Sequence, residues 1–312
     1  MPIQFEKKLA YRVFGYNILS EVEIPELPEA TQTEDSEYQV GIVIRKGNLK
    51  PLWNRLAKKD ESYFATNNLI LFHIPGLAIF SIEKGKEIIF SPYNGVNETK
   101  IHNYILSSCM AAVLLQRKVI PLHGSAMDIN GKAYAFIGHS ESGKSTLASA
   151  FIREGYKILS DDLIAVSFSN EGHPFVTPSF PRQQLWDDSL KGFGVEPKHY
   201  LPLYQSPHRT KYAVPVSLYF STERLPLAGI FELKKTENES IEIHPLQGLD
   251  ALRTLFKHTF RNFFIKPMGS AEWHFTQTAK LINQLPVYRL ERPASCYTVN
   301  ELVSVILTTI NK

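Results

Sequence analysis

One eight-residue segment constrains this chain more than any other feature of its 312 residues. It matches the phosphate-loop spacing G-x-x-x-x-G-K-[ST] and consists of Gly138-His139-Ser140-Glu141-Ser142-Gly143-Lys144-Ser145. The two glycines let successive backbone amides curl around a phosphate, the lysine supplies positive charge to the β- and γ-phosphates, and the serine hydroxyl suits Mg²⁺. The segment therefore predicts a binding site for a nucleoside triphosphate, and we include Thr146 among the nucleotide-binding residues.

The residues on either side of this loop predict the structural context that it needs. Apolar runs at 126–129 and 133–137, joined by Asn130-Gly131, are typical of a β-hairpin. A helical pattern begins directly at Lys144. A strand that enters the loop and a helix that leaves it would place the helix N-terminus, with its unpaired amides, against the phosphates.

Two neighbouring carboxylates follow the next predicted strand, at 156–159. Asp161 and Asp162 stand where a buried strand would deliver them to the edge of a sheet. One carboxylate can hold Mg²⁺, directly or through water, and the other can accept the proton of an attacking hydroxyl. A turn with two solvated aspartates is the alternative, and the nearby phosphate loop makes it the weaker interpretation.

These residues resemble the C-terminal catalytic domain of HPr kinase/phosphorylase. The residues that carry the likeness, in matching order over about forty positions, are His123-Gly124-Ser125, the phosphate loop, Gly155-Tyr156 and Asp161-Asp162. In layout the whole chain is most similar to the HPr-kinase-like proteins encoded with lasso-peptide clusters, which phosphorylate a serine at the C-terminus of the precursor. A β-rich N-terminal part and the late segment Leu-Pro-Val-Tyr-Arg-Leu at 285–290 carry that second likeness.

The resemblance implies roles for particular residues and names their ligands. It implies that Asp161 is the general base, that Asp162 lies on the magnesium side with Ser145, and that His123 acts beside Lys144 in proton handling or charge at the transferred phosphate. From residue type alone, a histidine before glycine is more often a structural turn residue. ATP, Mg²⁺ and a peptide or small-protein acceptor are the implied ligands, and a homo-oligomer is the implied assembly.

Two departures from the family pattern narrow this expectation. Glu141 stands where the bifunctional enzymes carry glycine, and a carboxylate beside phosphates is unfavourable unless it faces solvent or a basic residue. The glycine- and arginine-bearing segment of the enzymes that also run the phosphorylase reaction is not recognisable in this sequence. We therefore expect a relative with kinase activity alone.

Phosphoryl transfer needs positive charge beyond the loop lysine. The later chain offers Arg209 and Lys211, in a basic loop-like cluster, and Arg289, in a predicted strand, as possible contacts to the phosphates or the acceptor. Clusters of this kind are also common on solvated surfaces, and Arg289 can instead make a structural ion pair. Both interpretations stay open for all three residues.

The patterns along the chain predict an α/β protein with two domains. Residues 1–97 consist of short strand-like runs and turns, for which we expect a smaller β-rich domain with an antiparallel sheet. Residues 98–312 begin with a helical pattern and are expected to form an HPr-kinase-like P-loop catalytic domain. The segment 178–225 shows no sustained period, for which we expect functional loops or a short helix near 185–191.

Composition excludes several partners and compartments. A formal net charge of +3 is too mild to predict nucleic-acid binding. Two cysteines cannot form a disulfide framework, and no apolar stretch approaches the roughly 18 residues that a membrane span needs. We expect a cytoplasmic protein that binds neither nucleic acid nor membrane.

The preferred hypothesis is an ATP-dependent serine kinase that transfers the γ-phosphoryl group to a peptide or small-protein hydroxyl, with the C-terminal serine of a lasso-peptide precursor as the expected acceptor. An HPr-type kinase and a small-metabolite kinase are the alternatives within enzymes. A nucleotide-binding regulator without transfer activity is the alternative from another class. The Asp161-Asp162 pair argues against the regulator, because a sensor needs no catalytic base.

Overall fold

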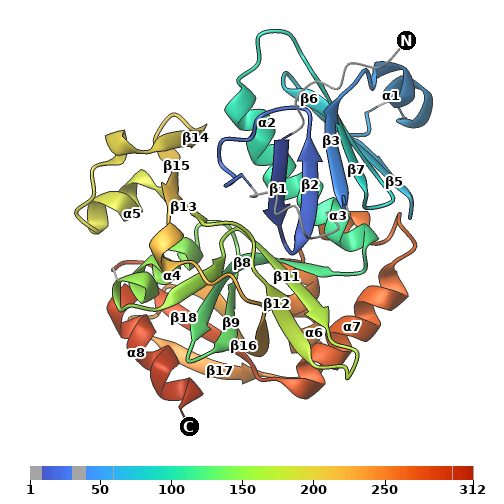
Figure 1. The fold of residues 1–312 in the computed structure, drawn as a ribbon. Helices are drawn as coiled ribbons and strands as arrows, with labels where there is room; N and C mark the ends of the chain where they lie inside the picture. Colours follow the sequence, from blue (N-terminus) through green and yellow to red (C-terminus); the bar gives the residue numbers. More distant parts are fainter. Residues whose placement is uncertain (1–8, 30–39, 59, 297, 312) are drawn as a thin grey trace, which may run out of the picture. The chain divides into compact units, whose positions relative to one another are not determined.

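A computed structural model describes residues 9–29, 40–58, 60–296 and 298–311 of the chain (Figure 1). The chain divides into two compact units, of which the first comprises Met1–Val119 with Phe263–His274 and the second comprises Ile120–Asn262 with Phe275–Lys312. Strands and helices occur in both units, which confirms the mixed α/β class. Among the residues described, no helix is both long enough and apolar enough to cross a membrane.

The first unit is built on a mixed seven-stranded sheet with the order β1-β2-β3-β7-β6-β5-β4. Its strands are β1 Leu9–Val13, β2 Tyr16–Ser20, β3 Ile42–Lys46, β4 Tyr63–Ala65, β5 Leu69–Ile74, β6 Ala78–Glu83 and β7 Glu87–Pro92. β3 pairs in parallel with both β2 and β7, whereas the other pairs are antiparallel. The expected antiparallel sheet is therefore wrong in strand direction, because the parallel pairings join segments that local patterns do not connect.

Helices pack on this sheet through apolar side chains. α1 (Lys50–Leu56) packs with Leu52 and Trp53 against a cluster formed by Leu49, Leu71, Ile79 and Ile89. A longer helical segment consists of α2 (Glu98–Tyr104), one π-helical turn (Ile105–Cys109) and α3 (Met110–Gln116). Tyr104 stacks on Phe80 of β6, with 5.8 Å between ring centroids. Because its buried face meets this sheet, the segment belongs to the first unit, and the structure differs from the boundary expected at residue 97.

The second unit contains an eight-stranded sheet with the order β10-β8-β11-β12-β16-β18-β17, in which β9 pairs with β8 and β16. Its strands are β8 Ile120–Ile129, β9 Lys132–Ile137, β10 Lys157–Ser160, β11 Leu163–Phe168, β12 Pro174–Thr177, β16 Leu225–Thr236, β17 Glu242–Leu246 and β18 Val287–Pro293. The hairpin predicted at Asn130-Gly131 is confirmed by the antiparallel pairing of β8 with β9. β9, β16 and β18 run parallel, so their carboxyl ends meet at one edge.

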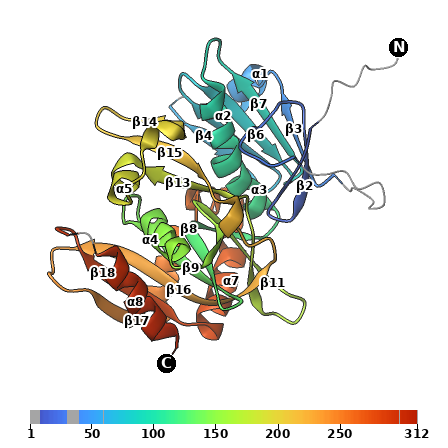
Figure 2. The same cartoon turned by 60° about the vertical axis from the view of Figure 1, so that its left-hand side comes forward.

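Two helices form the core of this unit with one face of the sheet (Figure 2). α4 (Lys144–Arg153) begins at the predicted residue and packs beside α8 (Val299–Ile310). Phe151 of α4 stacks on Phe136 of β9, with 5.3 Å between ring centroids. α6 (Gly248–His258) packs on β8. A further helix, α7 (Ala271–Gln284), precedes β18 in the chain.

The segment 178–225 forms a separate three-stranded sheet rather than loops. Its strands are β13 Arg182–Trp186, β14 Leu201–Gln205 and β15 Thr210–Pro215, in the order β13-β15-β14. The predicted short helix is present as α5 (Asp187–Gly192). The strands escaped prediction because they are short, two of them contain proline, and β13 pairs with a strand more than twenty residues away.

Candidate functional site

The phosphate loop connects β9 to α4 at the edge where the parallel strands end. Gly138 and Gly143 have φ angles of 155° and 105°, in a region that favours glycine. A Cβ on Gly138 would lie 2.5 Å from the carbonyl oxygen of Leu233, so only a residue without a side chain fits at this position. Gly143 directly precedes α4, whose first backbone amides have no carbonyl partner within the helix. The backbone is therefore prepared for an anion, as the motif predicts.

Lys144 is the buried cation of this loop, with 7% of its surface exposed. Its Nζ donates to the carbonyl oxygen of His139 at 2.7 Å. Burial lowers the pKa of Lys144 to about 8, although the neighbouring carboxylates of Asp162 and Asp161 act in the opposite direction. Because loss of hydration disfavours the ammonium ion, a phosphate in the loop would restore the stability of its charged form.

Asp161 is buried and accepts three hydrogen bonds. Its Oδ1 accepts from the hydroxyls of Ser125 at 2.5 Å and Ser145 at 3.0 Å, and its Oδ2 accepts from the backbone N–H of Gln184 at 2.7 Å. Burial is the largest effect on this carboxyl and raises its pKa, against the hydrogen bonds from Ser125 and Gln184. The Ser145–Asp161 contact joins the loop hydroxyl to a carboxylate, and such oxygen ligands fit Mg²⁺.

Asp162 faces a different set of groups. Its Oδ1 lies 3.7 Å from Nδ1 of His123 and 4.0 Å from Nζ of Lys211. Burial raises the pKa of Asp162, but the positive charge of Lys211, followed by the interactions with His123 and Lys144, outweighs burial, and the net direction is downward. Asp162 is therefore an ionised carboxylate at neutral pH, beside cations rather than beside the loop serine.

His123 lies beside Asp162 and is held by two contacts. Its Nδ1 donates to the backbone carbonyl oxygen of Asp162 at 3.0 Å, and its ring stacks on Phe260 with 5.1 Å between centroids. Burial lowers the pKa of His123 to about 4, so the imidazole is neutral at neutral pH. Since a carbonyl can only accept, the proton is on Nδ1 and Nε2 remains an acceptor.

The predicted residues meet around a cavity of about 280 Å³ in the second unit. Those that line it are His123, Ser140, Glu141, Gly143, Lys144, Ser145, Thr146, Asp161, Asp162, Arg209 and Lys211. Gly138, His139 and Ser142 do not line it and instead shape the loop. The structure thus brings together the phosphate loop, both aspartates and the histidine, which are far apart in sequence.

Two of the three predicted basic residues reach this cavity, and both come from one hairpin. Arg209 forms an ion pair with Glu141, and its guanidinium carbon lies 4.2 Å from the ring centroid of Trp186. Lys211, two residues later, is the cation beside Asp162. The expectation that Glu141 faces solvent or a basic residue is confirmed by its contact with Arg209.

Arg289 does not line the cavity and instead makes an ion pair within the sheet, which is the second of the two interpretations that the sequence left open. Its Nε donates to Oε2 of Glu232 at 2.7 Å, and Oε1 of Glu232 lies 2.9 Å from Nε2 of His258. Glu232 is almost fully buried, and these partners lower its pKa to about 2 even though burial acts upward. Arg289 lies three residues before Arg292 in β18, and its side chain is held by Glu232 of the neighbouring strand.

Several residues that line the cavity were not predicted from the sequence. Lys235 and Arg292 are register partners near the carboxyl ends of β16 and β18, and both line the cavity. Arg292 Nε donates to the carbonyl oxygen of Ser142 at 3.0 Å. Their position near the carboxyl ends of strands parallel to β9 is a usable signal, because ligands of open α/β sheets bind at such strand ends. This signal can be used only when the order of the strands in the sheet is known, and the sequence alone does not give that order.

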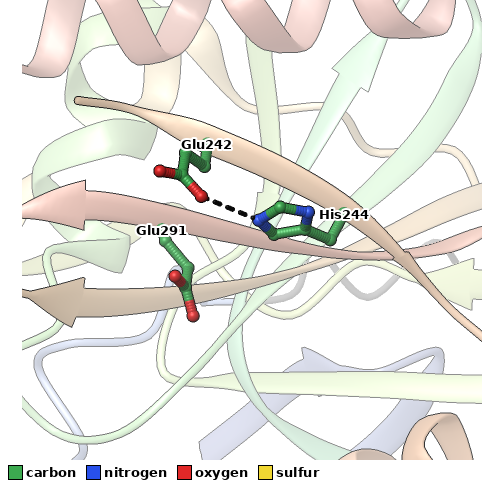
Figure 3. A group of neighbouring side chains, drawn as sticks. All are labelled: Glu242, His244 and Glu291. Carbon is green, nitrogen blue, oxygen red and sulfur yellow. Dashed lines mark hydrogen bonds and ion pairs between the residues drawn. The ribbon is translucent and has the colours of Figure 1, made fainter. Parts of the chain in front are cut away.

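A second group of polar side chains lies on β17 and β18 (Figure 3). Glu242, His244 and Glu291 each offer one ligand atom, and these atoms lie within 4.8 Å of one another. His244 Nε2 is 3.1 Å from Oε2 of Glu242, and Lys234 Nζ donates to Oε1 of Glu291 at 2.9 Å. Because neighbouring cationic and imidazole groups already accompany these carboxylates, the group needs no metal ion, and we assign none.

Strand, glycine loop and helix follow one another in the second unit as in phosphate-loop proteins, and this is the class of site with which its geometry agrees. No known family model matches the chain. It is 27% identical over 159 residues to the HPr kinase/phosphorylase of Lachnoclostridium phytofermentans, an alignment covering 48% of this chain and 50% of that protein. The chain thus spans about half the length of this curated relative.

The second similarity is to a solved structure, that of the Hpr(Ser) kinase/phosphatase from Coxiella burnetii. The two structures align with a TM-score of 0.31 at 10% sequence identity, over 61% of this chain and 94% of that one. A likeness at this level is too distant to carry an argument. The sequence relative therefore supports a resemblance to HPr kinase/phosphorylase, and residue roles rest on the geometry of the cavity.

Proposed function

We propose that the chain is an ATP-dependent serine kinase. The observation that carries this proposal is the meeting of Lys144, the Ser145–Asp161 pair and the Asp162–His123 pair around one cavity. The first three residues are suited to a phosphate chain with its magnesium ion. The Asp162–His123 pair offers an ionised carboxylate and a neutral imidazole, which are the groups that a hydroxyl acceptor needs for loss of its proton.

In the proposed reaction the acceptor oxygen attacks the γ-phosphorus, and the bond between the γ-phosphorus and the β–γ bridging oxygen breaks. The hydroxyl proton passes to the site carboxylate, and ADP leaves with the bridging oxygen. Lys144 and the loop amides hold the phosphates, and Lys211 supplies charge beside the transferred group. Mg²⁺, held by Ser145 and a carboxylate, would neutralise charge on the phosphate oxygens.

The contacts favour a division of labour between the two aspartates that reverses the one expected from the family resemblance. Asp161 is bonded to Ser145, so we assign it to the magnesium side. Asp162 is ionised and adjoins His123, so we assign it the proton. The raised pKa of Asp161 favours the original assignment of that residue as base, but its carboxylate oxygens are already engaged by three donors.

Substitution of each aspartate by asparagine separates these assignments. We expect Asp162→Asn to abolish transfer and to leave the Mg²⁺ dependence of nucleotide binding intact. Asp161→Asn should abolish transfer and also remove the gain in nucleotide affinity that Mg²⁺ provides. If Mg²⁺ strengthens binding to Asp161→Asn as much as to the wild type, the expected assignment from the resemblance is restored.

For the acceptor we propose a peptide serine, specifically the C-terminal serine of a lasso-peptide precursor. The support for this narrower proposal is the similarity in layout between the chain and the lasso-cluster kinases. An HPr-type protein and a hydroxyl-bearing metabolite are the other acceptors to be tried. Acceptor choice is independent of the phosphate site, so failure of the peptide would leave the nucleotide proposal standing.

Mass spectrometry of candidate acceptors, incubated with ATP and Mg²⁺, tests the proposal. A gain of one phosphoryl mass on a serine-ended precursor peptide is expected for the wild type and for Lys132→Ala, a matched control at an exposed lysine. Lys144→Ala should show no gain. ATP binding without transfer to peptide, HPr-type protein or metabolite would contradict the kinase and favour a nucleotide-binding regulator.

A further inference from the structure

We propose that Arg209 distinguishes a nucleoside triphosphate from a diphosphate, and that Glu141 holds Arg209 in place until a γ-phosphate replaces the carboxylate. This inference rests on the proposed nucleotide site and deepens it. It concerns the ion pair between Glu141 of the phosphate loop and Arg209 of the β14–β15 hairpin, two segments that are far apart in the sequence. Three observations carry it: the placement of Arg209, the conformation of Glu141 and the charges around them.

Arg209 occupies a defined position at the tip of the hairpin. Ser206 closes the turn, because its N–H and its hydroxyl both donate to the carbonyl oxygen of Arg209, at 2.9 and 3.0 Å. The guanidinium then lies over Trp186, whose ring meets that of Tyr204 edge-on at 6.1 Å. A guanidinium supported by an aromatic face keeps its N–H groups available for an anion in the cavity.

Glu141 lies within the phosphate loop and carries a carboxylate at the cavity. Its φ of 67° is left-handed, which is uncommon for a residue with a side chain. Its carboxylate contacts the guanidinium of Arg209. Because a guanidinium recognises carboxylate and phosphate oxygens with the same planar set of donors, Glu141 can act as an internal substitute for a phosphate.

The surrounding charges favour exchange of that carboxylate for a more highly charged group. Lys235 and Arg292 also line the cavity, and within the described part of the chain neither forms an ion pair with a carboxylate. Burial lowers the pKa of Lys235, and the charges of Arg292 and Arg209 lower it further. A terminal phosphate carries more negative charge than a carboxylate, so it binds this group of cations more strongly.

The position of Lys211 indicates which phosphate Arg209 would meet. Lys211 follows Arg209 by two residues, both line the cavity, and Lys211 adjoins Asp162, where the transferred phosphoryl group is proposed to lie. Arg209 lies in the turn that Ser206 closes and Lys211 lies at the start of β15, so both side chains reach the cavity from the same end of the hairpin. Arg209 therefore faces the γ-phosphate, and ADP, which lacks it, would leave the Glu141–Arg209 pair intact.

Calorimetric titration with ADP and with a non-hydrolysable ATP analogue, each with Mg²⁺, tests this inference. For Arg209→Gln we expect about tenfold weaker binding of the analogue, as for a lost charge-assisted contact, and ADP affinity within about twofold of the wild type. Glu141→Gln should bind the analogue more tightly than the wild type. Lys198→Gln, which removes an exposed lysine paired with Glu196 in the same segment, should change neither affinity.

The fluorescence of Trp186 provides a readout that a merely structural role would not change. The analogue should alter this emission by drawing Arg209 away from the ring, ADP should not, and Trp186→Phe should abolish the difference. Equal weakening of ADP and analogue in Arg209→Gln, or an unchanged analogue affinity, overturns the inference while the nucleotide site stands. Failure of the wild type to bind either ligand overturns the nucleotide site and the inference together.

Discussion

Replacement of Asp161 by asparagine should inactivate the site without unfolding the unit that contains it. Asp161 is buried, with 6% of its surface exposed. Its carboxylate accepts hydrogen bonds from the buried N–H of Gln184 and from two serine hydroxyls. Asparagine can keep its carbonyl oxygen toward Gln184 and turn its amide toward the serines, whose oxygens accept as well as donate. Alanine can do neither.

The magnitudes follow from these contacts. In Asp161→Ala the N–H of Gln184 loses its acceptor in a buried place, which costs about 1–3 kcal/mol, and the two serine contacts add to this, giving roughly 2–4 kcal/mol in total. In Asp161→Asn the number of contacts is kept and a buried titratable group is replaced by one that does not titrate. We expect its free energy of unfolding to lie within about 1 kcal/mol of the wild type at neutral pH.

The pH dependence has a definite sign. Since burial raises the pKa of Asp161 above its value of 3.8 in a model compound, its favourable contribution is complete below that value and is lost as pH rises through the folded-state pKa. Asparagine does not titrate. Relative to the wild type, Asp161→Asn should therefore become more stable as pH is raised from acidic to neutral.

Urea unfolding without metal or nucleotide measures these differences. Trp186 is the tryptophan of the second unit, since Trp53 and Trp273 belong to the first, so a Trp53→Phe, Trp273→Phe background reports on the second unit by fluorescence. An Asp161→Asn variant as unstable as Asp161→Ala would refute the reasoning, because it would mean that the negative charge itself, and not hydrogen bonding, stabilises the fold.

Three further predictions concern other parts of the second unit. Gly124→Ala should destabilise it by about 1–3 kcal/mol in urea unfolding, because the new Cβ would lie 2.2 Å from the carbonyl oxygen of Phe136, and wild-type stability would contradict this packing. Glu232→Gln should cost roughly 2–4 kcal/mol at pH 7, and because the pKa of Glu232 is about 2, the difference should shrink between about pH 4.5 and 2 in the same assay. ADP affinity should fall about tenfold between pH 7 and 9 as Lys144, with a pKa of about 8, loses its proton, and a pH-independent affinity in calorimetry would exclude Lys144 as the titrating cation.

The sequence alone predicted those parts of the site that are encoded locally. The phosphate loop is one continuous segment, so Gly138, Gly143 and Lys144 could be placed between a strand and a helix from spacing and periodicity. The Asn-Gly turn and the start of α4 were predicted for the same reason. Each of these features depends on residues only a few positions apart.

The contacts that assign roles were decided by the tertiary structure. Asp161 and Asp162 are neighbours in sequence, yet one is bonded to Ser145 and the other faces His123 and Lys211. No periodicity distinguishes two adjacent carboxylates, because their directions depend on backbone angles and on strands contributed by other segments. The expected magnesium-side and base assignments came from resemblance, and the geometry favours exchanging them.

Long-range pairing also determined which cations reach the cavity. Arg289 and Arg292 lie three residues apart in β18, but Arg289 pairs with Glu232 in the sheet and Arg292 contacts the phosphate loop. The sequence predicted a phosphate-binding loop, since the loop is one continuous segment that carries its own backbone conformation. The register of the parallel strands decided that Lys235 and Arg292, and not Arg289, accompany the loop, because that register is set by burial and hydrogen bonding across the whole sheet.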